Sequence, residues 1–153
     1  MEKTMTRQEI FNKVADHLLT QGKPALFDEI GDCAYRGQDG SMCAVGCLIP
    51  DELYTPEMEL KSVDTLLKAE FVLPGFFYDN YTLLSDLQII HDSVAASGTF
   101  RYYSVPSTDP ASVVDKWCSS LAWYAENHDL EKSPKMLERF ASYLEQQDRE
   151  LGS

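Results

Sequence analysis

Hydrophobic positions recur at helical spacing along most of the chain, and the N-terminal stretch shows this most clearly. Thr6 followed three residues later by Glu9 is a capping box, which marks a helix start, while Gly22 and Pro24 mark its end. Between these signals one apolar face is formed by Ile10, Phe11, Val14, Ala15, Leu18 and Leu19. We therefore expect this segment to be a helix that covers the core.

The same kind of pattern predicts four further helices. Each begins at a capping residue or at a cap followed by proline, and each repeats its apolar residues with a helical period. His91 falls in the latter half of the second of these helices. The predicted segments are residues 62–73, 80 or 82–96, 110–127 and 134–148.

Residues 33–45 have a different pattern. Polar and apolar residues alternate up to Arg36, turn residues follow with Asp39-Gly40 as the expected tip, and Met42 to Val45 can return as a second strand. Residues 99–105 have strand composition and form either a third strand or an extended loop. The predicted fold class is α+β, mostly α, with about five helices around one core and a small β-hairpin near residues 33–45.

Cys43 to Ile49 is an apolar run that only Gly46 interrupts. A glycine at such a place lets another stretch of backbone approach closely, which favours a buried helical turn packed on the first helix. Pro50-Asp51-Glu52 follows as a predicted helix start, where the free amide groups favour negative charge.

The chain has 153 residues, 44% of them hydrophobic and 25% charged, which predicts one globular domain over residues 1–153. We expect its ends, residues 1–5 and 149–153, to be frayed. No run approaches the roughly 18 apolar residues of a membrane span, and the first residues lack the apolar core of a signal peptide. These features predict a cytoplasmic protein that does not enter a membrane.

Negative charge is concentrated in the middle of the chain. Residues 37–100 contain ten acids against two lysines and so carry −8 of the net −12. Such a field repels phosphate backbones, which argues against direct nucleic-acid binding, and it favours partners with a basic surface. The alternative is that the charge serves only solubility.

Three of the four cysteines lie between residues 33 and 54, and two hypotheses give them chemistry. Cys33, Cys43, Cys47 and His91 have the ligand types of a structural zinc site, although no C-x2-C knuckle is present. Alternatively Cys43 or Cys33 is a nucleophile with His91 as base, and Asp92 or Asp86 is the group that orients the base. The third interpretation, which we adopt, is that the cysteines are buried core thiols, with no catalytic residue and no metal.

The acidic residues and Arg36 also allow two interpretations each. Asp51, Glu52, Glu57 and Glu59 can cap a helix and face water, or they can hold a cation. Arg36, the only arginine between residues 7 and 101, can pair with neighbouring acids or bind a ligand anion beside Tyr35. No phosphate-binding loop or comparable cofactor motif occurs, so we expect no cofactor.

Three stretches resemble a family of small uncharacterised proteins of bacterial genomes and phages. They are F-x2-V-A-D-H-L-L-T-Q at 11–21, C-A-Y-R-G-x-D-G-x2-C-A-V-G-C-L-I-P-D-E-x-Y at 33–54 and L-L-x-D-L-Q-x2-H-D at 83–92. The resemblance covers roughly residues 6–60 and 83–130 and brings no known activity. It implies a phage or prophage accessory gene, among which inhibitors of host systems are frequent.

These observations together predict a small acidic binding protein without enzymatic activity. We expect it to inhibit a host factor by engaging a protein partner through the acidic, aromatic surface of residues 50–81. The expected binding residues are Tyr35, Arg36, Asp51, Glu52, Tyr54, Glu57, Glu59, Phe76 and Tyr78. The alternative function is a binder of a nucleotide or metabolite, or a thiol enzyme, centred on residues 33–54.

Overall fold

The part of the chain that the computed structural model describes, residues 4–26, 34–37, 39–94 and 110–151, is helical. Its α-helices are α1 (Arg7–Gln21), α2 (Val63–Lys68), α3 (Gly75–Asp79), α4 (Tyr81–Asp92), α5 (Pro110–Asn127) and α6 (Pro134–Leu151). Two single turns of 3-10 helix, η1 (Gly46–Leu48) and η2 (Pro56–Met58), lie between α1 and α2.

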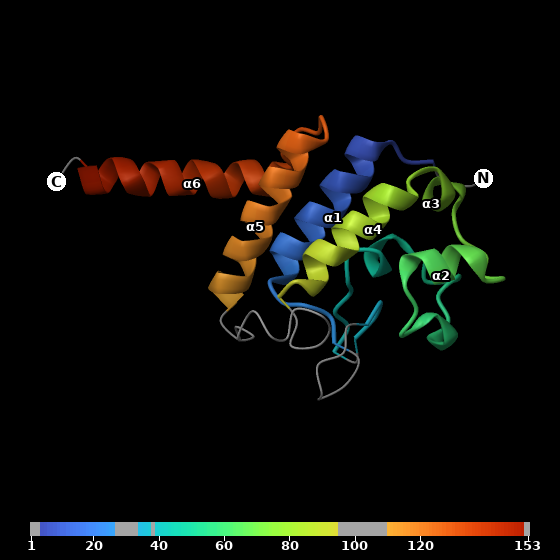
Figure 1. Cartoon of the computed structure of the whole chain (residues 1–153). Coiled ribbons are helices and arrows are strands. Elements are labelled where there is room, and N and C mark those ends of the chain that lie inside the picture. Colours follow the sequence, from blue (N-terminus) through green and yellow to red (C-terminus); the bar gives the residue numbers. More distant parts are fainter. Residues whose placement is uncertain (1–3, 27–33, 38, 95–109, 152–153) are drawn as a thin grey trace.

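Helix α1 is central to the packing, because α4, α5, α6 and η1 all contact it. In Figure 1, α1, α4 and α5 run side by side, while α2 and α3 contact α4 on the side that faces away from α5. The largest buried side chains of the three long helices, among them Phe11, Leu84, Leu87, Trp117 and Leu121, are fully enclosed between them. Helix α6 contacts α1 near its own start and then extends away from the other helices (Figure 1).

The predicted N-terminal helix is confirmed together with both of its ends. Thr6 Oγ1 accepts from the Glu9 amide at 3.1 Å, and Glu9 Oε1 accepts in return from the Thr6 amide at 3.0 Å. Gly22 ends the helix in the left-handed region, at φ 72°, where glycine carries no steric penalty. The local signals and the tertiary packing agree here, because the predicted apolar face is also the buried one.

The predicted hairpin at residues 33–45 is wrong, and with it the α+β fold class. In the described residues this stretch makes one isolated antiparallel bridge, between Arg36 and Met42, and no strand. Two backbone hydrogen bonds flank this bridge, from the Gly37 amide to the Ser41 carbonyl at 2.8 Å and from the Cys43 amide to the Tyr35 carbonyl at 3.2 Å. The neighbouring amides donate to side chains instead of a further strand: Gln21 Oε1 accepts from the Met42 amide at 2.8 Å. Glu59 likewise accepts from the amides of Tyr35 and Arg36, at 2.8 and 3.1 Å. The third strand or extended loop predicted at 99–105 lies outside the described residues.

Other boundaries also differ from the prediction. Pro50-Asp51-Glu52 begins a turn rather than a helix, in which the Pro50 carbonyl accepts from the amides of Leu53 and Tyr54 at 2.9 and 3.1 Å. The aromatic tract after Pro74 forms the short helix α3, which was not predicted. Helix α4 ends at Asp92 rather than residue 96, and α6 continues to Leu151. Within the described residues, no helix combines the length and the apolar character needed to cross a bilayer.

Candidate docking groove and the predicted binding residues

Glu59 organises the polar residues around the segment expected to bind. Its side chain accepts from the backbone amides of Tyr35 and Arg36 and from the Tyr54 hydroxyl, the last at 2.5 Å. The residue is only 8% exposed, so these donors replace the water that a free carboxylate would require. Burial and the hydrogen bond to Glu59 raise the pKa of Tyr54 to about 12. Glu59 is therefore a structural acceptor.

Arg36 is held in place by the same cluster. Its guanidinium pairs with Asp51 at 2.7 Å, donates to the Ile49 carbonyl at 2.7 Å and lies 4.6 Å from the centre of the Tyr54 ring. Its buried Nε–H has no hydrogen-bond partner within the part of the chain that is described. Two of its five N–H groups thus have internal partners and its side chain is only 21% exposed, as the salt-bridge interpretation predicts.

The remaining predicted binding residues divide between surface and core. Asp51, Glu52 and Glu57 are exposed, and Tyr78 is half-exposed. Phe76 is buried and packs against Phe77, with ring centres 5.1 Å apart. Tyr35 is also buried, and its hydroxyl donates to the Lys61 carbonyl at 2.5 Å. The predicted surface of residues 50–81 therefore keeps Asp51, Glu52 and Glu57 but loses the buried Glu59, and it has fewer aromatic groups than its sequence contains.

Two of the three cysteines that the structure describes lie in this region, and both are protected. Cys43 is fully buried, and its sulfur accepts from the Gly46 amide at 3.2 Å. Burial raises the pKa of its thiol well above the usual value, and it raises that of Cys47 to about 12. A thiol with a raised pKa is a poor nucleophile at neutral pH, because little thiolate is present. Cys33 lies outside the described residues.

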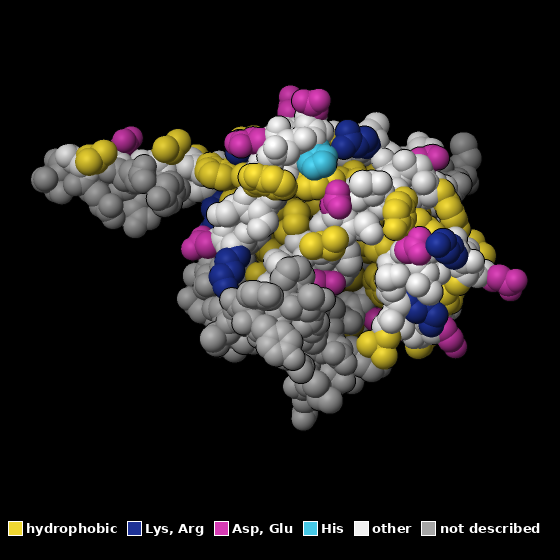
Figure 2. Space-filling view, in the orientation of Figure 1, with side chains coloured by type: hydrophobic (Ala, Val, Ile, Leu, Met, Phe, Trp, Pro, Cys, Tyr) yellow, Lys and Arg dark blue, Asp and Glu magenta, His cyan; other side chains and the backbone are white. Residues whose placement is uncertain are grey.

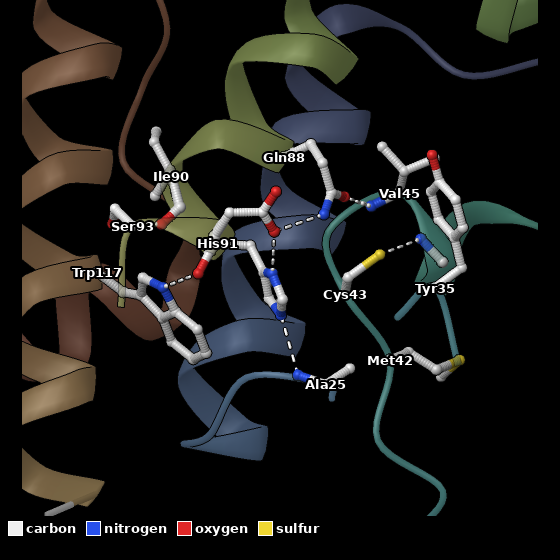
Figure 3. A network of polar contacts seen from close by, with 12 residues as sticks. Ala25, Tyr35, Met42, Cys43, Val45, Gln88, Ile90, His91, Ser93 and Trp117 are labelled. Atoms are coloured by element: carbon white, nitrogen blue, oxygen red, sulfur yellow. Dashed lines mark hydrogen bonds and ion pairs between the residues drawn. The ribbon is translucent and has the colours of Figure 1, made fainter. Parts of the chain in front are cut away.

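His91 is buried and has partners on both ring nitrogens (Figure 3). Nε2 accepts from the Ala25 amide at 3.0 Å, so the ring proton lies on Nδ1, which donates to Asp92 at 2.8 Å. The ring also stacks on Trp117, with centres 5.7 Å apart. No lone pair remains for a metal or for a substrate proton. Its contacts instead join α4 to the chain that follows α1.

Asp92 extends the same hydrogen-bond network toward the apolar run of residues 43–49. Gln88 donates to the Asp92 carboxylate at 2.9 Å and accepts from the Val45 amide at 3.1 Å (Figure 3). The described histidine, cysteine and aspartate groups of the two alternative hypotheses, a zinc site and a thiol active site, are thus hydrogen bonded within the fold. No cluster of three or more histidine, cysteine or acidic side chains that could hold a metal occurs among the described residues.

A pocket of 440 Å³ lies beside Tyr35, between the start of α2 and the face of α4. Three of its polar lining groups already have partners: Gln88 and Asp92 belong to the network above, and Lys61 donates to the Glu57 carbonyl. Leu60 at its edge is 68% exposed and has a positive φ of 63°. The pocket has the size of a small-molecule site but few polar groups left to recognise a ligand.

A larger groove, of 660 Å³, lies between α4 and α5. Two of the hydrophobic side chains that line it are exposed to solvent, Trp123 at 64% and Ile89 at 54%. Figure 2 shows hydrophobic side chains in a band over these helices, with acidic side chains beside it. The residues that line the groove are Asp86, Ile89, Ile90, Ser93, Ser119, Ser120, Trp123, Tyr124 and His128.

The polar side of this groove is rigidly arranged. The Tyr124 hydroxyl donates to Asp86 at 2.8 Å, and the His128 ring stacks on Tyr124 with centres 4.0 Å apart. Burial and the neighbouring Asp86 carboxylate raise the pKa of Tyr124, so its hydroxyl stays a donor. The groove thus offers an acidic and aromatic side, held by these contacts, next to an exposed apolar edge formed by Trp123 and Ile89.

Sequence reasoning did not identify this groove, although one signal was present. The apolar face of α5 follows Val113, Trp117, Leu121 and Tyr124, and Trp123 lies off that face on a helical wheel. A tryptophan on the polar side of an amphipathic helix is a signal for a contact surface, because it exposes a large apolar area to water. The position of α4, which forms the other side of the groove, cannot be predicted from the same pattern.

Comparison with known proteins adds no relative: no family model, no curated protein and no solved structure matches this chain.

Proposed function

We propose that this chain is a small acidic protein without enzymatic activity that works in the cytoplasm as an accessory inhibitor of the phage or prophage type, by binding a host protein. The single observation that carries the proposal is the α4–α5 groove with its exposed Trp123 and Ile89. The inhibitory role rests on the motif of residues 33–54, and the binding role rests on the groove.

A groove between two neighbouring helices fits an amphipathic helix of a partner. Such a helix places residues of one face, three and four positions apart, into the groove as anchors. Trp123 would supply the main contact, because tryptophan is enriched among the few interface residues that carry most of the binding energy. Asp86 and the Tyr124 hydroxyl offer an acceptor and a fixed polar edge to that helix.

The charge of the surroundings indicates a partner helix with basic flanks. Asp86 lies in the groove, and the exposed Glu126 and Asp129 follow Trp123 along the chain. The exposed acids of residues 50–81 add to the same negative field, with Asp51, Glu52 and Glu57 among them. This field attracts a basic partner before contact is made and repels nucleic acid.

The two alternative functions, a thiol enzyme and a small-ligand binder, have less support from the contacts of the residues that they require. A thiol enzyme needs a reactive thiolate and a free base, whereas Cys43 is buried with a raised pKa and His91 has both nitrogens occupied. A small-ligand site at Arg36 needs free donors, but that guanidinium pairs with Asp51 and with a carbonyl. Protein binding at the groove instead uses Trp123 and Ile89, whose side chains are exposed to solvent.

The proposal is tested by affinity capture from a bacterial lysate, followed by titration with the purified captured protein. We expect Trp123→Ala to weaken that complex by about 2 kcal/mol, roughly thirtyfold, without a change in melting temperature. Ile89→Ala should act in the same direction with a smaller effect.

Tyr78→Ala is the matched control, because Tyr78 is an aromatic residue of similar exposure on the surface of residues 50–81. It should leave the affinity within about twofold if the groove is the site. A complex that depends on Tyr78 and not on Trp123 would place binding on the surface of residues 50–81. A chain that captures no protein, or that turns over a metabolite, would contradict the proposed function itself.

A further inference from the structure

We propose that α6 pairs with α6 of a second copy of this chain, in antiparallel orientation, through a stripe of exposed leucines. This inference concerns oligomerisation and is independent of the groove between α4 and α5. It rests on the spacing of the leucines, their exposure, the direction of α6 and the distribution of charge along it.

The leucine stripe consists of Leu137, Leu144 and Leu151, each seven residues from the next. Phe140, three residues after the first of them, is partly buried against the core and is not part of the stripe, so the leucines occupy a single heptad position. A seven-residue spacing keeps these side chains on one side of a helix over its whole length. The stripe is therefore suited to pairing with another helix along its axis.

The body of the protein does not cover this stripe. The leucines are 56%, 59% and 85% exposed, in the order of the chain. Met136, on another side of the first turn, is fully buried and anchors α6 to the rest of the molecule. Figure 2 shows hydrophobic side chains spaced along one edge of the projecting helix. Leucines left in water at this spacing indicate a missing helical partner.

The distribution of charge along α6 favours an antiparallel copy as that partner. Around its start the three bases Lys132, Lys135 and Arg139 outnumber the two acids Glu131 and Glu138, which leaves a net charge of +1. Toward its end the three acids Glu145, Asp148 and Glu150 outnumber the one base Arg149, which leaves −2. An antiparallel pair brings the acidic end of one helix level with the basic start of the other, and it also opposes the helix dipoles favourably. A parallel pair would bring the two acidic ends together.

The charge of the whole molecule supports the same orientation. Each copy carries a net charge of −12, and most of the chain lies in the body from which α6 projects. The 18 residues of α6 span about 27 Å. An antiparallel pair separates the two bodies by roughly that length, about three Debye lengths at physiological salt, whereas a parallel pair would place them side by side.

Sedimentation or light scattering over a range of concentrations of the whole chain tests the pairing. We expect the apparent mass to rise toward that of a dimer as concentration increases. Leu144→Glu should weaken this association by more than about tenfold, because it places a carboxylate in the centre of an apolar seam. Leu144→Ala combined with Leu151→Ala keeps helix propensity high and should also weaken it.

Ser142→Glu is the matched control, because it adds the same charge to an exposed position of α6 away from the stripe. It should leave the dimer intact. The orientation is tested by mixing Leu137→Cys and Leu151→Cys chains under oxidising conditions: an antiparallel pair yields the cross-link between positions 137 and 151. Efficient cross-linking of Leu151→Cys with itself would indicate a parallel pair and overturn the orientation.

A chain that stays monomeric at every concentration would overturn the proposal and assign the stripe to a helix of another protein. A dimer that Leu144→Glu does not weaken would overturn it as well, because the contact would then lie elsewhere. Neither result depends on the groove variants Trp123→Ala and Ile89→Ala, so the two proposals fail separately.

Discussion

Gly46 shows how one missing side chain sets the path of the segment that precedes α2. A β-carbon built at this position would lie 1.9 Å from the Tyr35 carbonyl oxygen, far inside any permitted contact. Tyr35 cannot move away easily, because its amide is bonded to Glu59 and its hydroxyl to the Lys61 carbonyl. The close backbone approach that the sequence predicts at this glycine is confirmed.

Gly46→Ala should therefore destabilise the protein by about 3 kcal/mol, because the contact is with backbone and cannot be relieved by a side-chain rotation. Gly40→Ala provides the comparison: Gly40 has a φ of 86° but nothing lies within 4 Å of a β-carbon there. That change should cost about 1 kcal/mol from backbone strain alone. Urea unfolding of both variants measures the difference, and equal losses would contradict the steric explanation.

Glu59 provides a second prediction at the level of single residues. Glu59→Ala removes an acceptor from two backbone amides and the Tyr54 hydroxyl at once and should cost about 3 kcal/mol of unfolding free energy. Glu57→Ala, two residues away and exposed, should change stability by less than about 0.5 kcal/mol. Chemical denaturation distinguishes the two, and a near-neutral Glu59→Ala would show that water replaces the carboxylate.

Among the helices and turns, the elements that sequence reasoning predicted well are those whose signals are local. The capping box and Gly22 determine both ends of α1, and the proline starts determine α5 and α6. The prediction of a hairpin was wrong because its turn residues are compatible both with two strands and with a single isolated bridge. Whether the amides of Tyr35 and Met42 extend a ladder or donate to the side chains of Glu59 and Gln21 depends on residues distant in sequence, which no local pattern reports.

The candidate site was harder to predict than the helices for a related reason. Cysteine, histidine and acidic residues suggested chemistry by type, but His91 and Cys43 proved to be hydrogen bonded inside the core. The groove required knowledge of which helix lies beside α5, and helical periodicity does not contain that information. Trp123 alone carried a usable signal, because its position off the apolar face can be recognised without a structure.

The contact between α1 and the turn before η1 predicts a dependence on pH. His17 donates from Nε2 to the Met42 carbonyl at 2.8 Å, and burial lowers the pKa of its imidazole more than this hydrogen bond raises it. In the unfolded chain His17 has a pKa of 6.5, so just below this pH the unfolded chain binds more protons than the folded protein does. The stability due to neutral His17 is complete above that pH and is lost as the pH falls toward the folded pKa.

We expect the melting temperature to fall between about pH 7.5 and 5.5, where carboxylates contribute little. In His17→Gln, which keeps a donor for the carbonyl, this fall should be smaller. His128→Gln controls for a histidine that lies in the groove instead. A pH profile that His17→Gln leaves unchanged would contradict the assignment to His17.

For the whole molecule, the net charge of −12 predicts how the proposed complex responds to salt. Raising the ionic strength from about 50 to 500 mM should slow association by about tenfold or more, because screening removes the long-range attraction of a basic partner. Dissociation should change less, since it depends on contacts within the groove. Surface plasmon resonance at several salt concentrations separates the two rates, and a salt-independent association rate would contradict charge steering.

The different settings of the two tryptophans give the protein a pair of built-in optical reporters. Trp117 is fully buried and stacked on His91, whereas Trp123 is 64% exposed at the edge of the groove. Indole emission shifts to shorter wavelength when water is removed, so occupation of the groove should shift the red component due to Trp123, while unfolding should shift the blue component due to Trp117. Binding and folding can thereby be followed separately without an added dye.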